Sequence, residues 1–182
     1  MDHNHLRLLF LGDSLIEFFD WRGRFPEHEV HNLGIAGETV NGLYARLNGI
    51  FSRIKDADQV FIMSGINNLA MGDDHFIEPY RSVIRAVAVS YPSAVIHVHT
   101  LLPVLFPYIS NDTIAYLNSK LCSMAVNEGV DVIDLHALFL DQQGTPIASY
   151  LLEDGVHISS EGYALWSHVL EKLLTQPKPP QA

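Results

Sequence analysis

The stretch Leu6–Leu15, LRLLFLGDSL, carries an apolar run that stops abruptly at Gly12-Asp13-Ser14. A run of this length fits one buried strand of a parallel sheet and is too short to cross a membrane. In open α/β sheets, ligands bind in the crevice beyond the carboxyl ends of the strands. The aspartate and the serine therefore stand where a functional site is expected.

The rest of the chain repeats this pattern, because short apolar runs alternate with longer stretches of helical period. The alternation predicts an α/β fold in which helices cover both faces of a parallel sheet. The expected strands are residues 6–11, 29–33, 59–64, 94–100 and 130–134. The expected helices are residues 39–53, 75–91, 112–127 and a last helix that Ser159 caps and that ends near Leu174.

The length of 182 residues, of which 48% are apolar, fits one domain with one core. We expect this domain to span residues 1–175 and the proline-rich residues 176–182 to form a disordered tail. The formal net charge of -10 repels phosphate backbones, so nucleic acid is not an expected partner. Cys122 is the one cysteine, which excludes an intramolecular disulfide and favours a packing role in its helix.

The residues before the first apolar run lack the basic start of a secretory signal. We therefore expect no stable membrane insertion and a cytoplasmic location. A secreted chain whose leader had been removed would look the same.

Ser14 near one end of the chain, and Asp154 and His157 near the other, are the residue types of a serine-hydrolase triad. A serine hydroxyl is a weak nucleophile at neutral pH, so it needs a base to take its proton and a third group to hold that base in the right tautomer. The order serine, aspartate, histidine is one of the known orders for this set. The chain thus offers one residue for each role.

Further polar groups follow the other expected strands. Gly34-Ile35-Ala36-Gly37 follows the second strand, and Gly65-Ile66-Asn67-Asn68 follows the third. A backbone amide and an asparagine side chain are donors of the kind that stabilises an oxyanion. The sequence therefore holds the parts of an acyl-transfer site.

Four short blocks, in this order and across nearly the whole chain, resemble those of the SGNH hydrolases, also called GDSL esterases. They are Gly12-Asp13-Ser14-Leu15, Gly37-Glu38-Thr39, Gly65-Ile66-Asn67 and Asp154-Gly155-Val156-His157. The resemblance implies that Ser14 is the nucleophile, His157 the base and Asp154 its orienting partner. It also implies an oxyanion hole made by the amides of Ser14 and Gly37 and the side chain of Asn67. The implied fold is a flavodoxin-like three-layer α/β/α sandwich with a five-stranded parallel sheet of order 2-1-3-4-5.

One position departs from the family pattern, which often has an aspartate where this chain has Asn68. Acetylhydrolases that resemble the platelet-activating-factor type also carry Asn-Asn there, and residues 32–47 look more like that branch than like the lysophospholipase branch. The Gly-x-Ser-x-Gly elbow of α/β-hydrolases is absent, because Ile16 occupies the place of its second glycine. That fold is therefore disfavoured.

Each piece also has a plainer interpretation. The segment 12–14 fits an ordinary capped strand-to-helix turn, and Asp154 with His157 fits a solvated turn before the last helix. Asn67 fits an Asx turn, and Gly34 and Gly37 fit tight backbone geometry. The functional interpretation is favoured because all these groups fall at strand ends in the right order.

His97 and His99 alternate on one strand and face the same side of the sheet, which permits metal binding. No cysteine or carboxylate completes a ligand set nearby, so packed histidines are favoured. The glycine patterns of phosphate-binding loops are missing, so no nucleotide cofactor is expected. We expect neither a cofactor nor a metal.

Two aromatic groups are candidates to border an acyl pocket. Phe18, Phe19, Trp21 and Phe25 follow Ser14 closely, with core packing as an equal alternative. Phe106-Pro107-Tyr108 lies in the long loop of residues 101–111, which is a candidate specificity lid or a flexible surface turn.

We therefore expect a cofactor-independent serine esterase that hydrolyses small or short-acyl carboxylic esters through an acyl-enzyme intermediate. The alternatives are a non-catalytic module of the same fold that binds a carbohydrate or an acylated ligand, and a metal-dependent phosphoesterase. Because histidine titrates near ~6.5, a histidine base predicts activity that rises through weakly acidic pH. The natural ester or thioester and the oligomeric state stay open.

Overall fold

Five parallel strands form one sheet in the computed structural model of the chain, which describes residues 5–175. The strands are β1 (Arg7–Gly12), β2 (Glu29–Gly34), β3 (Gln59–Met63), β4 (Val95–His99) and β5 (Asp131–Ile133). Their order is β2-β1-β3-β4-β5, and every neighbouring pair is parallel. The predicted fold class and strand order are confirmed, and each strand end lies within one residue of its expected position.

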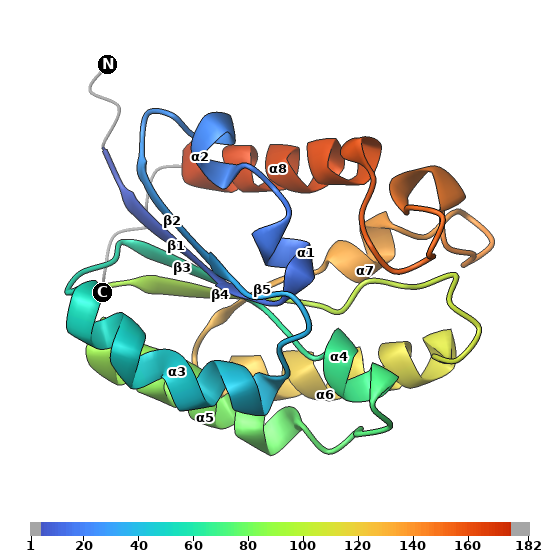
Figure 1. The fold of residues 1–182 in the computed structure, drawn as a ribbon, viewed down its shortest axis with the longest axis horizontal. Coiled ribbons are helices and arrows are strands. Elements are labelled where there is room, and N and C mark those ends of the chain that lie inside the picture. The colour runs from blue at the N-terminus through green and yellow to red at the C-terminus, as the bar shows by residue number, and fades with distance from the viewer. Residues whose placement is uncertain (1–4, 176–182) are drawn as a thin grey trace.

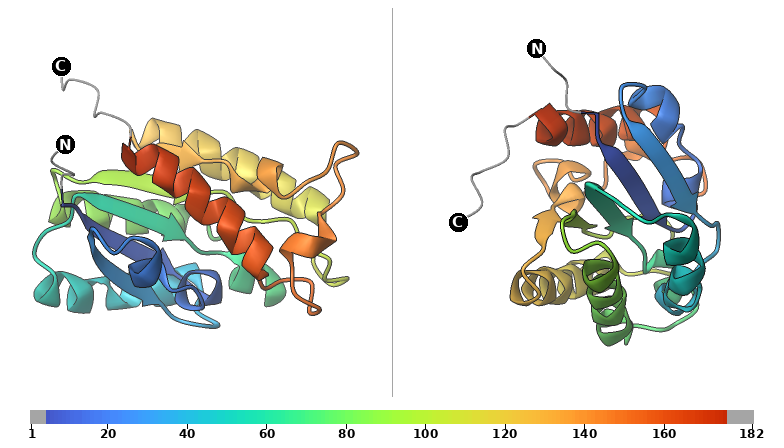
Figure 2. Two further views of the ribbon diagram at one scale, coloured as in Figure 1. Left: turned by 90° about the horizontal axis from the view of Figure 1, so that it is seen from above. Right: turned by 90° about the vertical axis from the view of Figure 1, so that its left-hand side faces the viewer.

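Helices cover both faces of this sheet, as Figures 1 and 2 show. On one face lie α2 (Trp21–Arg24) and α8 (Ser160–Thr175), and on the other lie α3 (Val40–Arg53), α5 (Ile77–Ser90) and α6 (Asn111–Asn127). The four long helices were predicted. The short elements α1 (Ser14–Glu17), α4 (Ile66–Ala70), α7 (Leu135–Leu138) and the 3₁₀ helix η1 (Ala148–Tyr150), together with α2, were not.

The helix caps explain where several long helices begin. Thr39 accepts a hydrogen bond from the Gly42 amide at the start of α3, at 3.2 Å. Ser159 accepts one from the Gly162 amide at the start of α8, at 3.2 Å, as predicted for this residue. Each side chain satisfies an amide that has no partner within the helix.

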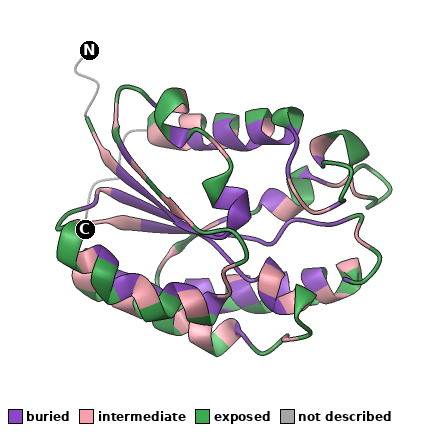
Figure 3. Cartoon of the chain, in the orientation of Figure 1, coloured by how far each residue is buried: buried purple, intermediate pink, exposed green. Residues whose placement is uncertain are grey.

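The central strands are buried along most of their length, as Figure 3 shows, and different side chains cover the two faces of the sheet. Toward α2 and α8, Phe10 stacks on Trp21 with ring centroids 4.3 Å apart and on Phe61 at 4.9 Å. On the other face, Val83 and Val87 of α5 are fully buried. Burial on both faces explains why the central strands are continuous apolar runs.

His97 and His99 belong to the buried aromatic face. The indole Nε1–H of Trp166 donates to His99 Nε2 at 3.1 Å, and His99 Nδ1 lies 3.2 Å from the Ile62 carbonyl oxygen. An indole only donates, so Nε2 of His99 is unprotonated and Nδ1–H donates to Ile62. Burial lowers the pKa of His99 to about 3 and that of His97 to about 4. Both are packed, neutral side chains, as predicted from the lack of further metal ligands near them in the sequence.

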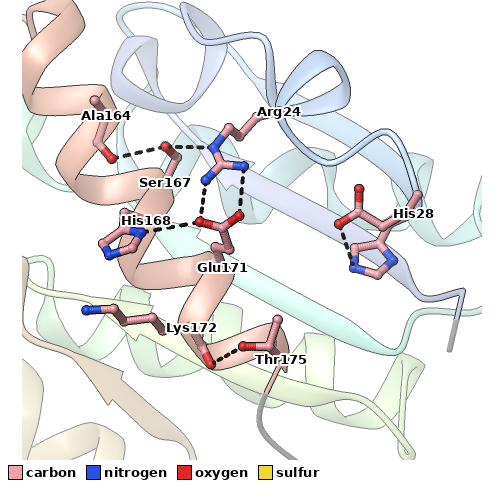
Figure 4. Close-up of polar contacts among 9 residues, drawn as sticks. Arg24, His28, Ala164, Ser167, His168, Glu171, Lys172 and Thr175 are labelled. Carbon is pink, nitrogen blue, oxygen red and sulfur yellow. Dashed lines mark hydrogen bonds and ion pairs between the residues drawn. The ribbon is translucent and has the colours of Figure 1, made fainter. Parts of the chain in front are cut away.

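Polar contacts join α2 to α8, two helices that lie far apart in the sequence (Figure 4). Arg24 Nη2 donates to Glu171 Oε2 at 2.7 Å, and Arg24 Nε donates to Ser167 Oγ at 3.1 Å over a separation of 143 residues. This contact brings the last helix against the segment that follows Ser14. It therefore helps to align the two ends of the chain that carry the candidate site.

Three other expectations concern the ends and the surface of the chain. Within residues 5–175, no helix is long and apolar enough to cross a bilayer. The predicted tail, residues 176–182, lies outside the described residues. Cys122 is half-buried on α6, and this burial raises the pKa of its thiol.

Candidate active site

Ser14 is the first residue of α1 and comes almost directly after β1. Asp13 is the N-cap of this helix, because its Oδ1 accepts a hydrogen bond from the Leu15 amide at 3.0 Å. The Ser14 hydroxyl is therefore carried on a sharp strand-to-helix turn at the carboxyl edge of the sheet. The two interpretations of residues 12–14 are therefore compatible, because the segment is a capped turn that also carries the candidate nucleophile.

His157 meets Ser14 although 143 residues separate them. His157 Nε2 lies 3.0 Å from Ser14 Oγ, and His157 Nδ1 lies 2.6 Å from Asp154 Oδ2. With Nδ1–H donating to the carboxylate, Nε2 is free to accept the serine proton. The structure thus brings the three predicted side chains into one hydrogen-bonded chain.

Asp154 is held in place by its own turn. Its Oδ1 accepts hydrogen bonds from the amides of Val156 and His157, both at 2.9 Å. Burial by itself raises the pKa of Asp154, but these two amides and the His157 imidazole outweigh it and keep the pKa below its ordinary value. The carboxylate therefore stays ionised at neutral pH and can stabilise a positive charge on the imidazole.

Gly37 and Asn67 lie on the two sides of Ser14. Gly37 is in the loop after β2 and Asn67 is in α4 after β3, and these two strands are the neighbours of β1 in the sheet. Gly37 has a φ of 77°, which a turn at this position requires and which favours glycine. Within residues 5–175, the amides of Ser14 and Gly37 donate to no other residue, which leaves both available to a ligand.

Asn67 does not form the Asx turn that was its plainer interpretation. Its Nδ2 donates to the carbonyl oxygen of Glu38 at 3.0 Å, which links α4 to the loop after β2. An asparagine amide carries two N–H groups, and among the described residues the second one has no acceptor. Asn67 can therefore serve as a donor whose orientation is fixed by the first bond.

Asn68, the departure from the family pattern, has a structural role that sequence reasoning missed. Its Oδ1 accepts from the Val40 amide at 2.9 Å, and its Nδ2 donates to Asp73 Oδ2 at 2.7 Å. An aspartate here could accept from Val40 but could not donate to another carboxylate. The asparagine thus joins the start of α3 to the segment after α4.

The aromatic group after Ser14 divides between the core and the site. Trp21 and Phe25 are buried in the core, whereas Phe18 is 59% exposed and its ring centroid lies 5.3 Å from that of His157. In the second group, Phe106 packs against the core and Tyr108 is 84% exposed. Phe18 is therefore the aromatic side chain that borders the Ser14–His157 pair.

The loop of residues 101–110 is anchored at several points. Asn118 on α6 pairs with both backbone groups of Leu101, at 2.8 and 2.9 Å. The Leu105 amide donates to the Gly155 carbonyl oxygen at 2.8 Å, which ties the loop to the turn that holds Asp154 and His157. This attachment places Leu105 beside the candidate site.

An α/β/α fold that holds a serine, a histidine and an aspartate in one hydrogen-bonded chain is the arrangement expected of a serine hydrolase. Residues 10–165 match the GDSL-like Lipase/Acylhydrolase family, so the chain belongs to this family and is an ester hydrolase of its class. The family recognised from the four sequence blocks is confirmed. A search of curated proteins found no significant match. Within residues 5–175, no group of three or more His, Cys, Asp or Glu side chains lies close enough together to hold a metal ion.

Solved structures with the same fold come from several bacteria. A Streptococcus pneumonia protein provisionally named a platelet activating factor is 24% identical, with a TM-score of 0.83 over 93% of this chain and 84% of that one. The lipase/acylhydrolase from Enterococcus faecalis is 20% identical, with a TM-score of 0.76 over 97% of this chain and 100% of that one. Axe2, an acetylxylan esterase from Geobacillus stearothermophilus, is 22% identical, with a TM-score of 0.75 over 97% and 98%. At these identities the likeness is one of fold.

Proposed function

We propose that the protein is a serine esterase that hydrolyses small or short-acyl carboxylic esters through an acyl-enzyme intermediate. The observation that carries the proposal is the pair of contacts at His157, 3.0 Å to Ser14 Oγ and 2.6 Å to Asp154 Oδ2. Both lie within the reach that proton transfer requires. They join a nucleophile, a base and an orienting group in the order that the chemistry needs.

In the first half of the proposed reaction, Ser14 Oγ attacks the ester carbonyl carbon while its proton moves to His157 Nε2. Asp154 accepts the Nδ1–H and stabilises the imidazolium. The tetrahedral oxygen receives hydrogen bonds from the amides of Ser14 and Gly37 and from the free N–H of Asn67. Removing one such donor in other enzymes typically costs about 10² to 10³ in rate.

In the second half, His157 gives its proton to the leaving alkoxide, and the alcohol departs. A water molecule then attacks the acyl carbon as His157 takes one of its protons. Collapse of the second tetrahedral intermediate breaks the bond to Ser14 Oγ, which regains its proton from His157 and releases the acid. No cofactor takes part in any of these steps.

Apolar residues in three segments that adjoin Ser14 or His157 support a substrate with an apolar acyl or alkyl group. Phe18 faces His157, while Ile35 follows β2 with its amide bonded to the Gly12 carbonyl oxygen, and Leu105 is bonded to Gly155. The exposed fractions of these three residues are 59%, 46% and 48%. Exposed apolar residues in the segments that adjoin the candidate site favour an acyl or alkyl group over a charged one. Because Leu105 is bonded to Gly155, the loop 101–111, which is the candidate specificity lid, lies against the turn that carries His157.

The test is hydrolysis of p-nitrophenyl acetate together with covalent labelling of Ser14 by a fluorophosphonate. We expect hydrolysis and labelling in the wild type, the loss of both in Ser14→Ala, and no effect of a chelator. Ser149→Ala is the matched control, because Ser149 lies in η1 and belongs to no part of the proposed site. A substrate panel of acetate, butyrate and octanoate esters, thioesters and acetylated xylan would then identify the preferred class.

Other results would favour the alternatives. Hydrolysis that a chelator abolishes and Ser14→Ala preserves would favour the metal-dependent phosphoesterase. Ligand binding with neither hydrolysis nor labelling would favour the non-catalytic binding module. A burst of p-nitrophenol is not required, because fast deacylation would hide it.

A further inference from the structure

The loop between β2 and α3 is tied to the sheet by an arginine from the helix that follows it. Arg46 Nε and Nη2 donate to the two Glu38 carboxylate oxygens, at 2.6 and 2.6 Å. Nη2 also donates to the Leu33 carbonyl oxygen at 2.7 Å and lies 3.5 Å from that of Gly12. The guanidinium therefore joins the carboxyl ends of β1 and β2 to the loop that carries Gly37.

Glu38 continues this connection on its other side. Its side chain is only 9% exposed and that of Arg46 is 22% exposed, so water competes little for the ion pair. The Glu38 backbone carbonyl accepts the hydrogen bond from Asn67 Nδ2 at 3.0 Å. One residue thus receives the guanidinium through its side chain and orients Asn67 through its backbone.

A second carboxylate holds the same loop from the side of Ser14. The Ala36 amide donates to Glu17 Oε2 at 2.5 Å, and Glu17 is the last residue of α1, which begins at Ser14. The loop is therefore fixed between two acidic side chains. Of these two, Glu38 is the one that also reaches Asn67.

We propose that Arg46 and Glu38 form a positioning pair that sets the spacing between Ser14 and the two other oxyanion donors, Gly37 and Asn67. The inference rests on the proposed esterase function. Neither side chain touches the reacting atoms. Donors stabilise a tetrahedral oxyanion only from hydrogen-bond distance, and a displacement of about 1 Å can cost about 10²-fold in rate. Arginine suits this position better than lysine, because a planar fork serves a carboxylate and a carbonyl at the same time.

The test measures kcat and KM for p-nitrophenyl acetate in Arg46→Met, Arg46→Lys and Glu38→Gln, with the folded fraction checked by circular dichroism. For Arg46→Met we expect kcat to fall about 10-fold to 10²-fold while KM stays within about threefold. Arg46→Lys should recover part of the loss, because it keeps the charge without the fork. The matched control is Arg53→Met on the same helix. Among residues 5–175, the Arg53 side chain bonds only to the Gly49 carbonyl oxygen of its own helix, at 3.0 Å, so kcat of this variant should not change.

The rate of Ser14 labelling by a fluorophosphonate should fall in parallel with kcat, because the phosphonyl oxygen uses the same donors. The double variant Glu38→Gln/Arg46→Met should lose no more than the larger single loss, since both changes break one ion pair. If Arg46→Met does not fold, Arg46→Lys and Glu38→Gln test the same prediction, and we expect kcat of each to fall about 10-fold.

Two results would overturn the inference while leaving the proposed function intact, provided that wild-type hydrolysis depends on Ser14. The first is a folded Arg46→Met variant whose kcat lies within about threefold of the wild-type value. The second is a double variant in which the two single losses of kcat multiply. A wild type with neither Ser14-dependent hydrolysis nor labelling would instead overturn the proposed function and the inference with it.

Discussion

The buried carboxyl of Asp13 makes the stability of the protein depend on pH in an unusual direction. Asp13 is 0% exposed, and its Oδ2 has no hydrogen-bond partner among the described residues. Burial raises the pKa of Asp13 from 3.8 to about 7, against the opposing effect of its hydrogen bond from the Leu15 amide and of the nearby His157. We predict that the wild type becomes less stable as the pH rises from weakly acidic to neutral, and that Asp13→Asn abolishes this part of the pH dependence.

The sign and size of the effect follow from proton linkage. Because the folded-state pKa lies above the unfolded value, the folded chain holds a proton that the unfolded chain has lost between about pH 4 and pH 7. The free energy of unfolding therefore falls as pH rises, by about 1.4 kcal/mol per pH unit and by about 4 kcal/mol across the whole shift. Between about pH 4.5 and 6.5 the contribution of Asp13 is about 2.5 kcal/mol.

The assay is urea unfolding followed by the fluorescence of the buried Trp21 and Trp166, at three pH values in this window. The stability of Asp13→Asn relative to the wild type should rise by about 2.5 kcal/mol from the lowest to the highest pH. His97 and His99 also affect the pH dependence, but they are present in both proteins and cancel in the difference.

Asp20→Asn is the matched control, because Asp20 is also an N-cap, accepting from the Gly23 amide at the start of α2, but lies at an exposed position. It measures the effect of removing a capping carboxylate that stays in water. A stability difference between Asp13→Asn and the wild type that stays constant within about 0.5 kcal/mol across the window would refute the linkage argument.

Three further predictions concern the site and its support. Asp154→Asn should lower kcat by about 10³ to 10⁴ with little change in KM, because His157 loses the carboxylate that holds its tautomer; a loss below about tenfold would contradict this role. Ser159→Ala should lower the free energy of unfolding in urea by about 1 to 2 kcal/mol, because its hydroxyl caps α8 through the Gly162 amide at 3.2 Å and donates to a backbone carbonyl at 2.6 Å. Phe18→Ala should raise KM for p-nitrophenyl butyrate about fivefold or more, and an unchanged KM would place Phe18 outside the acyl pocket.

The strands and long helices could be predicted because each is a local property of the chain. Residues 60–63 of the run at 59–64 are all apolar, as a strand covered on both faces requires, and β3 is buried throughout. The last helix could be located from Ser159, whose side chain makes the expected cap. The short elements α1, α2, α4 and α7 were missed because four or five residues are too few to show a helical period.

The contacts that position the candidate site could not be predicted in this way. Nothing in the sequence around Arg46 indicates that its guanidinium reaches Glu38 and the end of β2, because an exposed helix arginine has the same local pattern. Asn68 looked like a neutral departure from the family, yet it joins α3 to the segment after α4. Each of these roles depends on a partner from another element.

By itself, the sequence determined the class of fold, the strand ends at which polar groups gather, and the residue types available for acyl transfer. These follow from hydrophobic period, cap chemistry and motif order, which are written along the chain. Only the tertiary structure decided that Ser14 Oγ and His157 Nε2 lie 3.0 Å apart and that Glu38 links Arg46 to Asn67. Distances of this kind arise when separate elements pack against one sheet, so no local stretch of sequence contains them.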